Sequence, residues 1–566
     1  MNQLVTIDYV IFLLYFVGVS AYGYWIYNQK KTDSLDTKGF FLAEGSLTWW
    51  AIGASLIASN ISAEQFIGMS GSGFTLGVAI AAYEWLAAIA LIIVAVWFIP
   101  IYLKNHIFTM PQFLSQRYNE TVSMIMAVFW LFLYVFVNLT SILFLGALAL
   151  SNLVGGESFH MIIVSLSIFA IVITLGGMKV IGYTDVIQVL VLIVGGLVTT
   201  YLALDKVAEV LGVGSGAIDG FKGMMANADD HFHMIFEKPG PNTSQVDVNK
   251  YLTLPGISMY LAGQWIVNLN YWGCNQYITQ RALGADLKTA RTGILFAAIL
   301  KLFMPLVVMV PGIAAYVIYK NGGLQAEMTT NGKVMADNAY SAVLTFLPSG
   351  LKGLSVAALT AAIVASLAGK ANSISTIFTL DIFHKYVDKD ASEKKLVWVG
   401  RLTIVAAMLI SIMLAWGDAL GIGGEGGFTF IQKYTGYVSP GIFALFILGF
   451  FWKRTTGTAA IVGVLLGFAL AVLFNNFAPS LFGNETILYT AFYNSDSGNM
   501  EIPFLICMGW SFVFTVLAMV LISLAGPKIN PRGLEIDSSM FKLERSNIVL
   551  VVIIFMLLSV LYIRFW

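Results

Sequence analysis

The stretch 58–68, ASNISAEQFIG, places Asn60, Ser62, Glu64 and Gln65 inside a segment with apolar flanks. Amides and hydroxyls both donate and accept hydrogen bonds, whereas an ionised carboxylate only accepts them. Such groups cost free energy at membrane depth unless they are paired or hydrated, so the cluster is a functional hypothesis by default. Short polar side chains compete for backbone hydrogen bonds, and glycines follow the cluster. We therefore predict a helix break near 58–62.

Further polar side chains interrupt other apolar runs. Glu84 follows Tyr83 in AIAAYEWLAAIALIIVAVW, and Lys301 lies midway along LFAAILKLFMP. The run 252–280 carries amides and aromatic residues. Amides, carboxylates, an ammonium and aromatic faces are the groups that bind a neutral polyol, through hydrogen bonds to hydroxyls and stacking against a sugar ring. An anionic substrate would need more uncompensated positive charge.

A possible cation site follows from the small residues of the run 352–382. Ala362 and Ser366 are four residues apart and share a helix face. Backbone carbonyls released by a break near Ala58 and Ile61, together with a carbonyl and a hydroxyl on that face, would form an all-oxygen cage suited to Na⁺. No sequence pattern alone specifies sodium.

Each of these polar groups also has a structural interpretation, in which it stabilises helix packing and binds no ligand. Glu84 and Lys301 would then form a buried ion pair, and Ser366 would support close helix packing. The same interpretation makes Asn268 and Gln276 interhelical hydrogen-bonding groups, Met69 and Phe428 packing residues, and Lys370 and Lys433 residues at a helix end near water.

The elements that must position these residues are membrane helices. Of the 566 residues, 58% are hydrophobic and 11% charged, which indicates an integral membrane protein of the all-α class and a single transmembrane domain, 1–566. Cys274 and Cys507 lie in apolar segments, so we expect packing residues. Apolar runs of about 20 residues predict about fourteen spans: 4–27, 47–76, 78–103, 120–152, 160–176, 182–203, 252–280, 289–319, 352–382, 398–417, 424–452, 456–475, 500–525 and 546–565.

Charge placement predicts the orientation in a cell inner (plasma) membrane. Lys+Arg and Asp+Glu are equal at 31 each, so no charge excess indicates nucleic acid. If fourteen helices alternate, basic residues of the short connections, Lys30, Lys31 and Lys38 among them, gather on one side. Positive charge stays inside, so both termini should be extracytoplasmic.

Other functional classes are less favoured. We find no nucleophile and base pair, phosphate loop or HExxH pattern, so we expect no enzyme and no organic cofactor. A channel would need a continuous polar stripe, whereas here the polar residues gather near mid-membrane. The five histidines lie in or near loops, away from any substrate cluster. The expected partners are a small neutral solute, Na⁺ and the lipid bilayer, with no nucleic acid and no obligate protein partner.

The sequence resembles the sodium/solute symporter family along nearly the whole chain. The resemblance implies a LeuT-like core of two inverted five-helix repeats, 47–203 and 252–452, with one extra N-terminal helix, 4–27, and three extra C-terminal helices within 456–566. It also implies Na⁺-coupled symport of a neutral hexose, galactose or glucose, by alternating access. Inositol, a nucleoside or an amino sugar is the alternative cargo. The matching runs are FFLAEGSLTWWAIGASLIASNISAEQFIGMSGSG, YEW, FWLFLYVFVNLTS, YTDVIQV, YWGCNQYITQR, GILFAAILKL, PGIAAYVI, TIFTLDI and IQKYTGYVSPGI.

The resemblance implies roles for individual residues. Asp185 would meet the ion on its exit path, and proton coupling through it is a further variant. The other roles divide into sugar contacts (Gln65, Glu84, Asn60, Asn268, Lys301, Gln432 and Tyr271), gates (Met69, Tyr83 and Phe428, with Tyr271 as the inner gate) and Na⁺ ligands (the carbonyls of Ala58, Ile61 and Ala362 and the hydroxyl of Ser366).

Several positions depart from the family pattern. Ala365 and Ala87 stand where the family carries serines, so one hydroxyl ligand for sodium and one contact to sugar are absent. Lys179, Lys370 and Lys433 add positive charges that the family does not favour. These departures leave the sugar and the ion affinity open.

Overall fold

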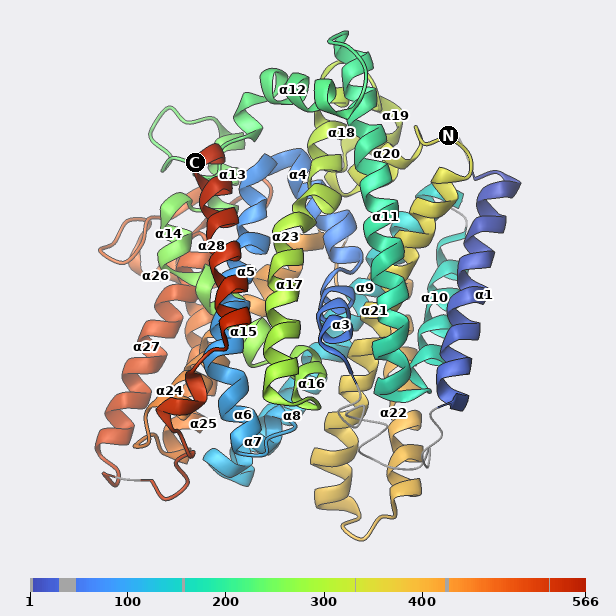
Figure 1. Cartoon of the computed structure of the whole chain (residues 1–566). Helices are drawn as coiled ribbons and strands as arrows, with labels where there is room; N and C mark the ends of the chain where they lie inside the picture. Colours follow the sequence, from blue (N-terminus) through green and yellow to red (C-terminus); the bar gives the residue numbers. More distant parts are fainter. Residues whose placement is uncertain (1–3, 30–46, 155–157, 331, 423–426, 529) are drawn as a thin grey trace. The chain divides into compact units, whose positions relative to one another are not determined.

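The computed structural model describes residues 4–29, 47–154, 158–330, 332–422, 427–528 and 530–566 (Figure 1). These residues are mostly helical, with two antiparallel two-stranded ribbons. Lys30, Lys31 and Lys38 lie outside the described residues, as does the side chain of Lys179. The chain forms two compact units that alternate along the sequence. Unit 1 comprises Met1–Ile80, Ala127–Phe232 and Gln280–Phe430, and unit 2 comprises Ala81–Met126, His233–Thr279 and Ile431–Trp566.

Ten helical stretches in the described part of the chain are long and apolar enough to cross a membrane. The helices Gly427–Gly436 and Ser439–Phe451, which meet at a bend of 51°, together make an eleventh. One of the ten, Glu64–Lys104, has 41 residues, which at 1.5 Å per residue is about twice the thickness of a hydrocarbon core. That stretch is too long for one crossing, and the expected number of fourteen stays a prediction.

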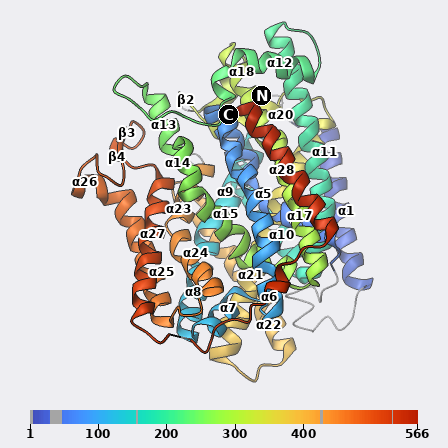
Figure 2. The same cartoon turned by 60° about the vertical axis from the view of Figure 1, so that its left-hand side comes forward.

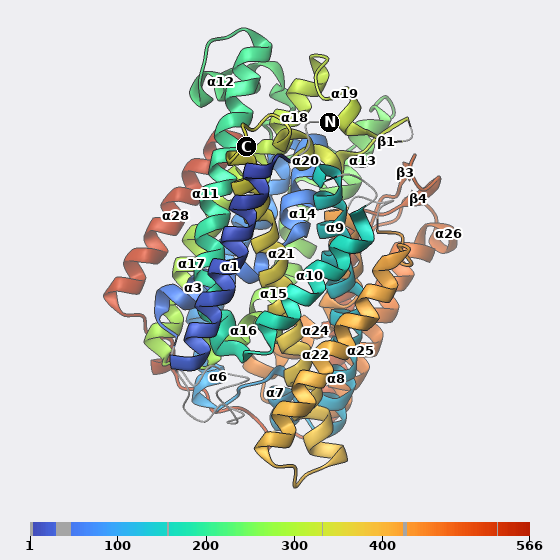
Figure 3. The ribbon, with the colours of Figure 1, turned by 90° about the vertical axis from the view of Figure 1, so that its right-hand side faces the viewer.

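Unit 1 surrounds helix α3, which packs against α11, α17 and α21. Helix α1 lies along α11 and α21 (Figures 1 and 3). Helix α8 (Glu120–Phe132), α16 (Gln276–Leu283) and α23 (Gly427–Gly436) contribute residues to both units. The remaining elements of unit 1 are α1 (Thr6–Gln29), α3 (Trp49–Asn60), η2 (Glu64–Met69), α4 (Ser70–Leu76), η3 (Gly77–Ala81), η5 (Leu133–Leu139), α9 (Thr140–Val154), α10 (Phe159–Thr174), α11 (Gly177–Leu211), α12 (Ala217–Asn227), η7 (Asp229–His231), α17 (Leu287–Val308), α18 (Val310–Lys320), α19 (Gln325–Met328), β1 (Thr329–Thr330), β2 (Lys333–Val334), η8 (Ala336–Asn338), α20 (Ala339–Leu344), α21 (Leu351–Thr376), η9 (Ile377–Val387) and α22 (Glu393–Trp416).

Two groups of connections lie at opposite ends of unit 1. Helices α12 and α19 lie at one end, together with the end of α18 (Figures 1 and 3). The connection between α16 and α17 and the connection between η9 and α22 lie at the other. Lys389 lies in the connection between η9 and α22, and Lys288 and Lys394 lie in the first turns of α17 and α22, directly after the two connections. This end of unit 1 therefore carries lysines on two separate segments.

The carboxylate of Asp8 anchors helix α1 to the start of α21. Its Oδ1 accepts hydrogen bonds from the N–H groups of Gly350 (2.7 Å) and Gly353 (2.9 Å). A carboxylate at a helix N-terminus satisfies unpaired N–H groups and interacts favourably with the helix dipole. A Cβ on Gly353 would lie 2.7 Å from Asp8 Cα, so this close approach requires glycine. The helix that carries Ser366 is therefore held at its first turn.

Unit 2 packs α15 against α5, α24 and α27. Helix α28 lies beside α5 (Figures 1 and 2), where the Trp85 ring packs against Tyr562 and Phe565. Its elements are α5 (Ala82–Ile93), η4 (Val94–Phe98), α6 (Ile99–Lys104), α7 (Met110–Arg117), α13 (Gln245–Thr253), α14 (Gly256–Leu261), α15 (Gly263–Gly273), α24 (Ser439–Phe451), α25 (Gly457–Val472), η11 (Leu473–Phe477), α26 (Ala478–Phe482), β3 (Phe492–Asn494), β4 (Asn499–Glu501), α27 (Phe504–Leu524), η12 (Ser538–Phe541) and α28 (Arg545–Phe565).

The run 252–280 is not the single helix that we predicted. It forms the end of α13 and then α14, α15 and α16. Ala262 separates α14 from α15 with φ −105° and ψ −114°, which is outside the helical region. Asn275 separates α15 from α16, and its Oδ1 accepts a hydrogen bond from the N–H of Tyr277 at 3.1 Å. Apolar composition is the same in a continuous and an interrupted helix, so the pattern of apolar residues did not reveal these breaks.

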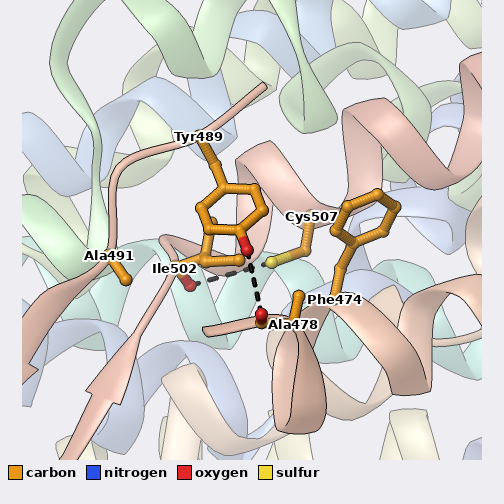
Figure 4. Packing of buried hydrophobic residues seen from close by; sticks show 6 residues of the cluster. All are labelled: Phe474, Ala478, Tyr489, Ala491, Ile502 and Cys507. Atoms are coloured by element: carbon orange, nitrogen blue, oxygen red, sulfur yellow. Dashed lines mark hydrogen bonds between the residues drawn. The ribbon is translucent and has the colours of Figure 1, made fainter. Parts of the chain in front are cut away.

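Both cysteines are buried free thiols, which confirms that they are packing residues. Cys507 lies in a cluster of unit 2 next to Phe474 and Tyr489 (Figure 4). In the same cluster the Tyr489 hydroxyl donates a hydrogen bond to the carbonyl of Ala478 at 2.9 Å. The hydroxyl of Tyr489 thus has a hydrogen-bond partner, while the ring fills the apolar space.

Arg117 joins α7 to the end of α24 inside unit 2. The side chain is fully buried, and it donates to the carbonyls of Gly449 (2.8 Å), Trp452 (2.9 Å) and Thr455 (3.1 Å). The last carbonyls of a helix have no partner within that helix. The planar guanidinium has five N–H donors and binds three carbonyls at once, one in the last turn of α24, one at its C-cap and one just beyond it.

We predict that Arg117→Lys lowers the free energy of unfolding by about 3 kcal/mol, because an ammonium cannot replace the three-way guanidinium contact and about two hydrogen bonds to a charged group are lost. Thermal unfolding of the purified protein in detergent measures the change. Arg454→Lys is the matched control, since Arg454 is only half-buried and also donates to two carbonyls. Equal losses in both variants would contradict the role of the buried site.

Candidate functional site

The predicted break in the second membrane helix is present in unit 1. Helix α3 ends at Asn60 and η2 begins at Glu64, so the interruption overlaps the expected range 58–62. Ser62 is at its centre. The N–H and the hydroxyl of Ser62 both donate to Gln65 Oε1 at 3.3 Å, and the hydroxyl accepts from the N–H of Glu64 at 3.2 Å. Side chains have therefore replaced part of the helical backbone hydrogen bonding.

This replacement releases the carbonyls that we predicted as sodium ligands. In an unbroken helix the N–H of Ser62 would bind the carbonyl of Ala58, but here it donates to Gln65. The N–H of Gln65 would likewise bind the carbonyl of Ile61, but it donates to the carbonyl of Ser62 at 3.1 Å. The carbonyls of Ala58 and Ile61 have thus lost the donors of a regular helix.

Helix α21 brings Ser366 to this break. Ser366 is fully buried, and its Oγ lies 3.5 Å from the carbonyl oxygen of Ala58 and 3.0 Å from that of Ser59. Two of the four predicted sodium ligands, Ala58 and Ser366, are therefore in contact. The carbonyl of Ser59, which we did not predict, lies closer to the hydroxyl than that of Ala58.

Three of the predicted sugar contacts lie in unit 1. Lys301 on α17 is 1% exposed and its ammonium donates a hydrogen bond to Oδ1 of Asn60, the last residue of α3. Gln65 is buried, and its amide oxygen caps the break. The break thus has the amide of Asn60 and the ammonium of Lys301 on one side and the amide of Gln65 on the other. Each of these groups forms a hydrogen bond within the protein that a hydrogen bond to a sugar hydroxyl could replace.

The remaining predicted sugar contacts lie in unit 2. Glu84 and Asn268 are buried, on α5 and α15, and Asn268 donates to the carbonyl of Gln264 at 3.0 Å. Tyr271 packs its ring against Trp272 at a centroid distance of 5.2 Å, and Gln432 is half-buried on α23. The sugar roles of these residues stay predictions, as does the alternative that Glu84 and Lys301 form an ion pair.

One structural interpretation is confirmed. The side chain of Gln276 accepts a hydrogen bond from the N–H of Met110 at 2.7 Å, and Gln276 is fully buried. This bond joins α16 to α7 within unit 2. Gln276 is therefore a helix-packing residue, as its structural interpretation proposed.

The predicted gate residues Met69 and Phe428 lie in unit 1, and both are buried. A Cβ on Gly68 would lie 2.5 Å from the backbone nitrogen of Phe428, so the glycine permits close contact between η2 and the start of α23. The third gate residue, Tyr83, is buried in unit 2. Gating itself stays a prediction for all three.

The model of the sodium:solute symporter family matches residues 40–467. A sodium/glucose cotransporter from Vibrio parahaemolyticus is 43% identical over 99% of this chain and 98% of its own length. The chain belongs to the sodium:solute symporter family. Sodium/myo-inositol cotransporter 2 from Mus musculus is 33% identical over 82% of this chain and 69% of its own. The solved structure of a Na⁺-coupled sialic acid symporter covers 93% of this chain and 99% of its own, with a TM-score of 0.76 at 21% identity, which shows a shared fold.

The residues at which this symporter departs from the family pattern lie in both units. Ala365 is buried beside Ser366, and Ala87 is buried on α5. Lys433 is half-buried on α23. Lys370, in contrast, is buried at 4% exposure on α21. We had considered that Lys370 lies where a helix meets water, and its burial shows that this was wrong.

Asp185 belongs to a network that the sequence analysis missed. Its Oδ2 accepts a hydrogen bond from the Ser55 hydroxyl at 2.5 Å and lies 3.9 Å from a guanidinium nitrogen of Arg281. Nε of Arg281 also donates to the Ser55 hydroxyl at 2.9 Å, and all three residues are buried. Arg281 is the first residue after the predicted membrane run 252–280, where a basic residue is expected at the end of a span. Its position directly after the polar run YWGCNQYITQ was the available signal.

The carboxylate of Asp337 connects η8 to the start of the symporter's α23. Its Oδ2 accepts a hydrogen bond from the N–H of Gly427 at 2.8 Å, next to the predicted gate residue Phe428. A Cβ on Gly71 would lie 2.6 Å from its Oδ1, so α4 also approaches the group closely. Burial raises the pKa of Asp337 to about 6, and the hydrogen bond from Gly427 opposes part of this rise.

We predict that this carboxylate makes the protein less stable as the pH rises. Its pKa is higher in the folded than in the unfolded state, so between about pH 4 and 6 the native state binds more protons and the free energy of unfolding falls with pH. Asp337→Asn keeps an acceptor for Gly427 and removes this dependence. Melting temperatures of both proteins from pH 4 to 7 test it, and parallel curves would contradict the prediction.

Proposed function

We propose that this symporter carries a neutral hexose, galactose or glucose, together with Na⁺ by alternating access. The observation that carries the proposal is the break between α3 and η2. It releases the carbonyls of Ala58 and Ile61, brings the Ala58 carbonyl to the Ser366 hydroxyl and directly adjoins the Asn60–Lys301 pair. The 43% identity over the full length of a sodium/glucose cotransporter supports the same cargo.

Sodium is the first cargo. We assign its ligands to the carbonyls of Ala58, Ile61 and Ala362 and the hydroxyl of Ser366. Alkali cations prefer oxygen ligands, and a helix break in a membrane is a common source of carbonyl ligands. The ion would bind a lone pair of the Ser366 hydroxyl oxygen, whose proton can still be donated to the Ser59 carbonyl at 3.0 Å. Asp185 lies on the proposed ion exit path.

The sugar is the second cargo. We propose that its hydroxyl groups form hydrogen bonds with Asn60, Gln65 and Lys301 of unit 1 and with Glu84, Asn268 and Gln432 of unit 2. The ring of Tyr271 would stack on the sugar ring. An amide or ammonium that already forms a hydrogen bond within the protein loses little free energy when a sugar hydroxyl replaces the partner. Myo-inositol is a second candidate, since it is also a cyclic polyol and a relative at 33% identity is named for it.

Coupling follows because both cargoes use the same interruption. Na⁺ bound to backbone carbonyls on one side of Ser62 stabilises the break, and the sugar uses side chains of the same few residues. Reciprocal coupling of this kind is typically worth about 1–3 kcal/mol. With the cell interior negative, each Na⁺ that enters contributes about 2.3 kcal/mol per 100 mV, enough to concentrate a neutral solute.

The remaining proposals concern architecture and location. We propose fourteen membrane helices, with inverted five-helix repeats over 47–203 and 252–452, and both termini outside the cytoplasm of a cell inner membrane. The likeness of fold to a Na⁺-coupled symporter supports the repeats. The lysines in and directly after the connections at one end of unit 1 support the orientation, since positive charge is retained inside.

Uptake into proteoliposomes tests the function. We predict that labelled galactose accumulates when Na⁺ is outside, and that K⁺ in its place supports no accumulation. Unlabelled glucose and galactose should compete better than myo-inositol. Lys301→Ala should abolish uptake while the protein remains folded. Equal uptake in both salts would refute sodium coupling, and failure of every hexose to compete would refute the cargo.

Ser366→Ala tests the sodium ligand. We predict that it raises the Na⁺ concentration for half-maximal uptake about tenfold, since one ligand of about 1.4 kcal/mol is lost. Thr360→Ala is the matched control on the same helix, because its buried hydroxyl bonds only to the carbonyl of Val356 among the described contacts. An unchanged Na⁺ dependence in Ser366→Ala would remove Ser366 from the ligand set.

A further inference from the structure

Lys370 is a buried cation inside unit 1. Its ammonium donates a hydrogen bond to Asn138 Oδ1 on η5 at 3.1 Å and lies 3.9 Å from Glu64 Oε1 on η2. Lys370 is 4% exposed and Glu64 9%. Removing either charge would leave the other uncompensated in a medium that solvates ions poorly. The two side chains therefore exist as a pair.

The pair lies on the same face of α21 as the proposed sodium ligands. Ala362, Ser366 and Lys370 are spaced by four residues, so each follows the last by about one helical turn, or about 6 Å. Ser366 contacts the end of α3, before the break. Lys370 contacts the first residue of η2, after it. Helix α21 thus connects both sides of the break, by a hydroxyl on one side and by a cation on the other.

The oxygens around the Lys370 ammonium are ligands that an alkali cation also prefers. They comprise a carboxylate and an amide oxygen, which are typical of hard-cation sites. Within the described residues Glu64 Oε1 accepts no hydrogen bond, so the ammonium at 3.9 Å is the neutralising group that the structure records for it. An ammonium and Na⁺ carry the same charge.

We infer that Lys370 is a tethered counter-cation, which occupies beside Glu64 and Asn138 the position that a second Na⁺ would otherwise take. The inference rests on the proposed sodium symport. Glu64 holds η2 against α21 only when a cation is next to it. Because the protein supplies this cation itself, the cycle needs one mobile Na⁺, at Ser366, and the site after the break stays closed to further ions.

Binding of radioactive Na⁺ to the purified protein in detergent, without sugar, tests the inference. The wild type should bind about one Na⁺ per chain, and Lys370→Met about two, since the variant leaves Glu64 as an uncompensated carboxylate. Lys370→Met with Glu64→Gln should return to about one. Lys352→Met is the matched control, a second buried lysine near the start of α21, and should leave the number unchanged.

Glu64→Gln alone provides an independent readout. It leaves the ammonium without its counter-charge, which should repel Na⁺ from the neighbouring Ser366 site and weaken its affinity about tenfold. A folded Glu64→Gln variant with wild-type affinity would overturn the inference, as would a Lys370→Met variant that binds one Na⁺. A wild-type protein that binds no Na⁺ would instead refute the proposed function.

Discussion

The interruption at Ser62 is the constraint on which the described site depends. A membrane offers no water to unpaired backbone groups, so a helix can break there only if other groups take over its hydrogen bonds. The hydroxyl of Ser62 and the amide of Gln65 do so for the N–H groups. The carbonyl oxygens of the same turn are left without their helical donors, and such oxygens are suited to bind a cation. An apolar residue at position 62 would have favoured a continuous helix.

Buried charge in unit 1 is compensated close to each charged group. In the pairs described below, an ionic group lies within a few ångströms of an opposite charge or of an amide oxygen, which lowers the free energy cost of its burial. Examples are Asp185 with Arg281, Glu64 with Lys370, and Lys301 with the amide of Asn60.

The break was predictable because its cause is local. Ser62 and Gln65 are three residues apart, and competition between such side chains and the backbone acts within one helical turn. The contact between Ser366 and α3 was partly predictable, since small residues on α21 favour close approach to a neighbour. Which carbonyl lies closer to the Ser366 hydroxyl, that of Ala58 or that of Ser59, was not predictable, because it depends on small rotations of the helices about their axes.

Other features escaped prediction because their partners are distant in the sequence. Ser55, Asp185 and Arg281 come from three separate segments, and no spacing rule connects them. Lys370 was expected near water because a lone lysine in an apolar run usually reaches the interface. Only the position of Asn138 and Glu64 around its ammonium shows why it remains inside. The break at Ala262 also escaped prediction, since a continuous and an interrupted helix can have the same apolar composition.

The position of the break also explains how one short segment can serve two cargoes. In the proposed function Ala58 and Ile61 take part through backbone carbonyls, and Asn60 and Gln65 through side chains, so the two proposed roles do not compete for the same atoms. Yet all four residues share one stretch of backbone, and a rotation that turns the carbonyls toward an ion also moves the side chains of Asn60 and Gln65. Two binding events that fix the same dihedral angles share that entropy cost, and the second event costs less than the first. If the two proposed sites are right, coupling between ion and solute follows from the covalent continuity of the break itself and needs no relay through distant parts of the fold.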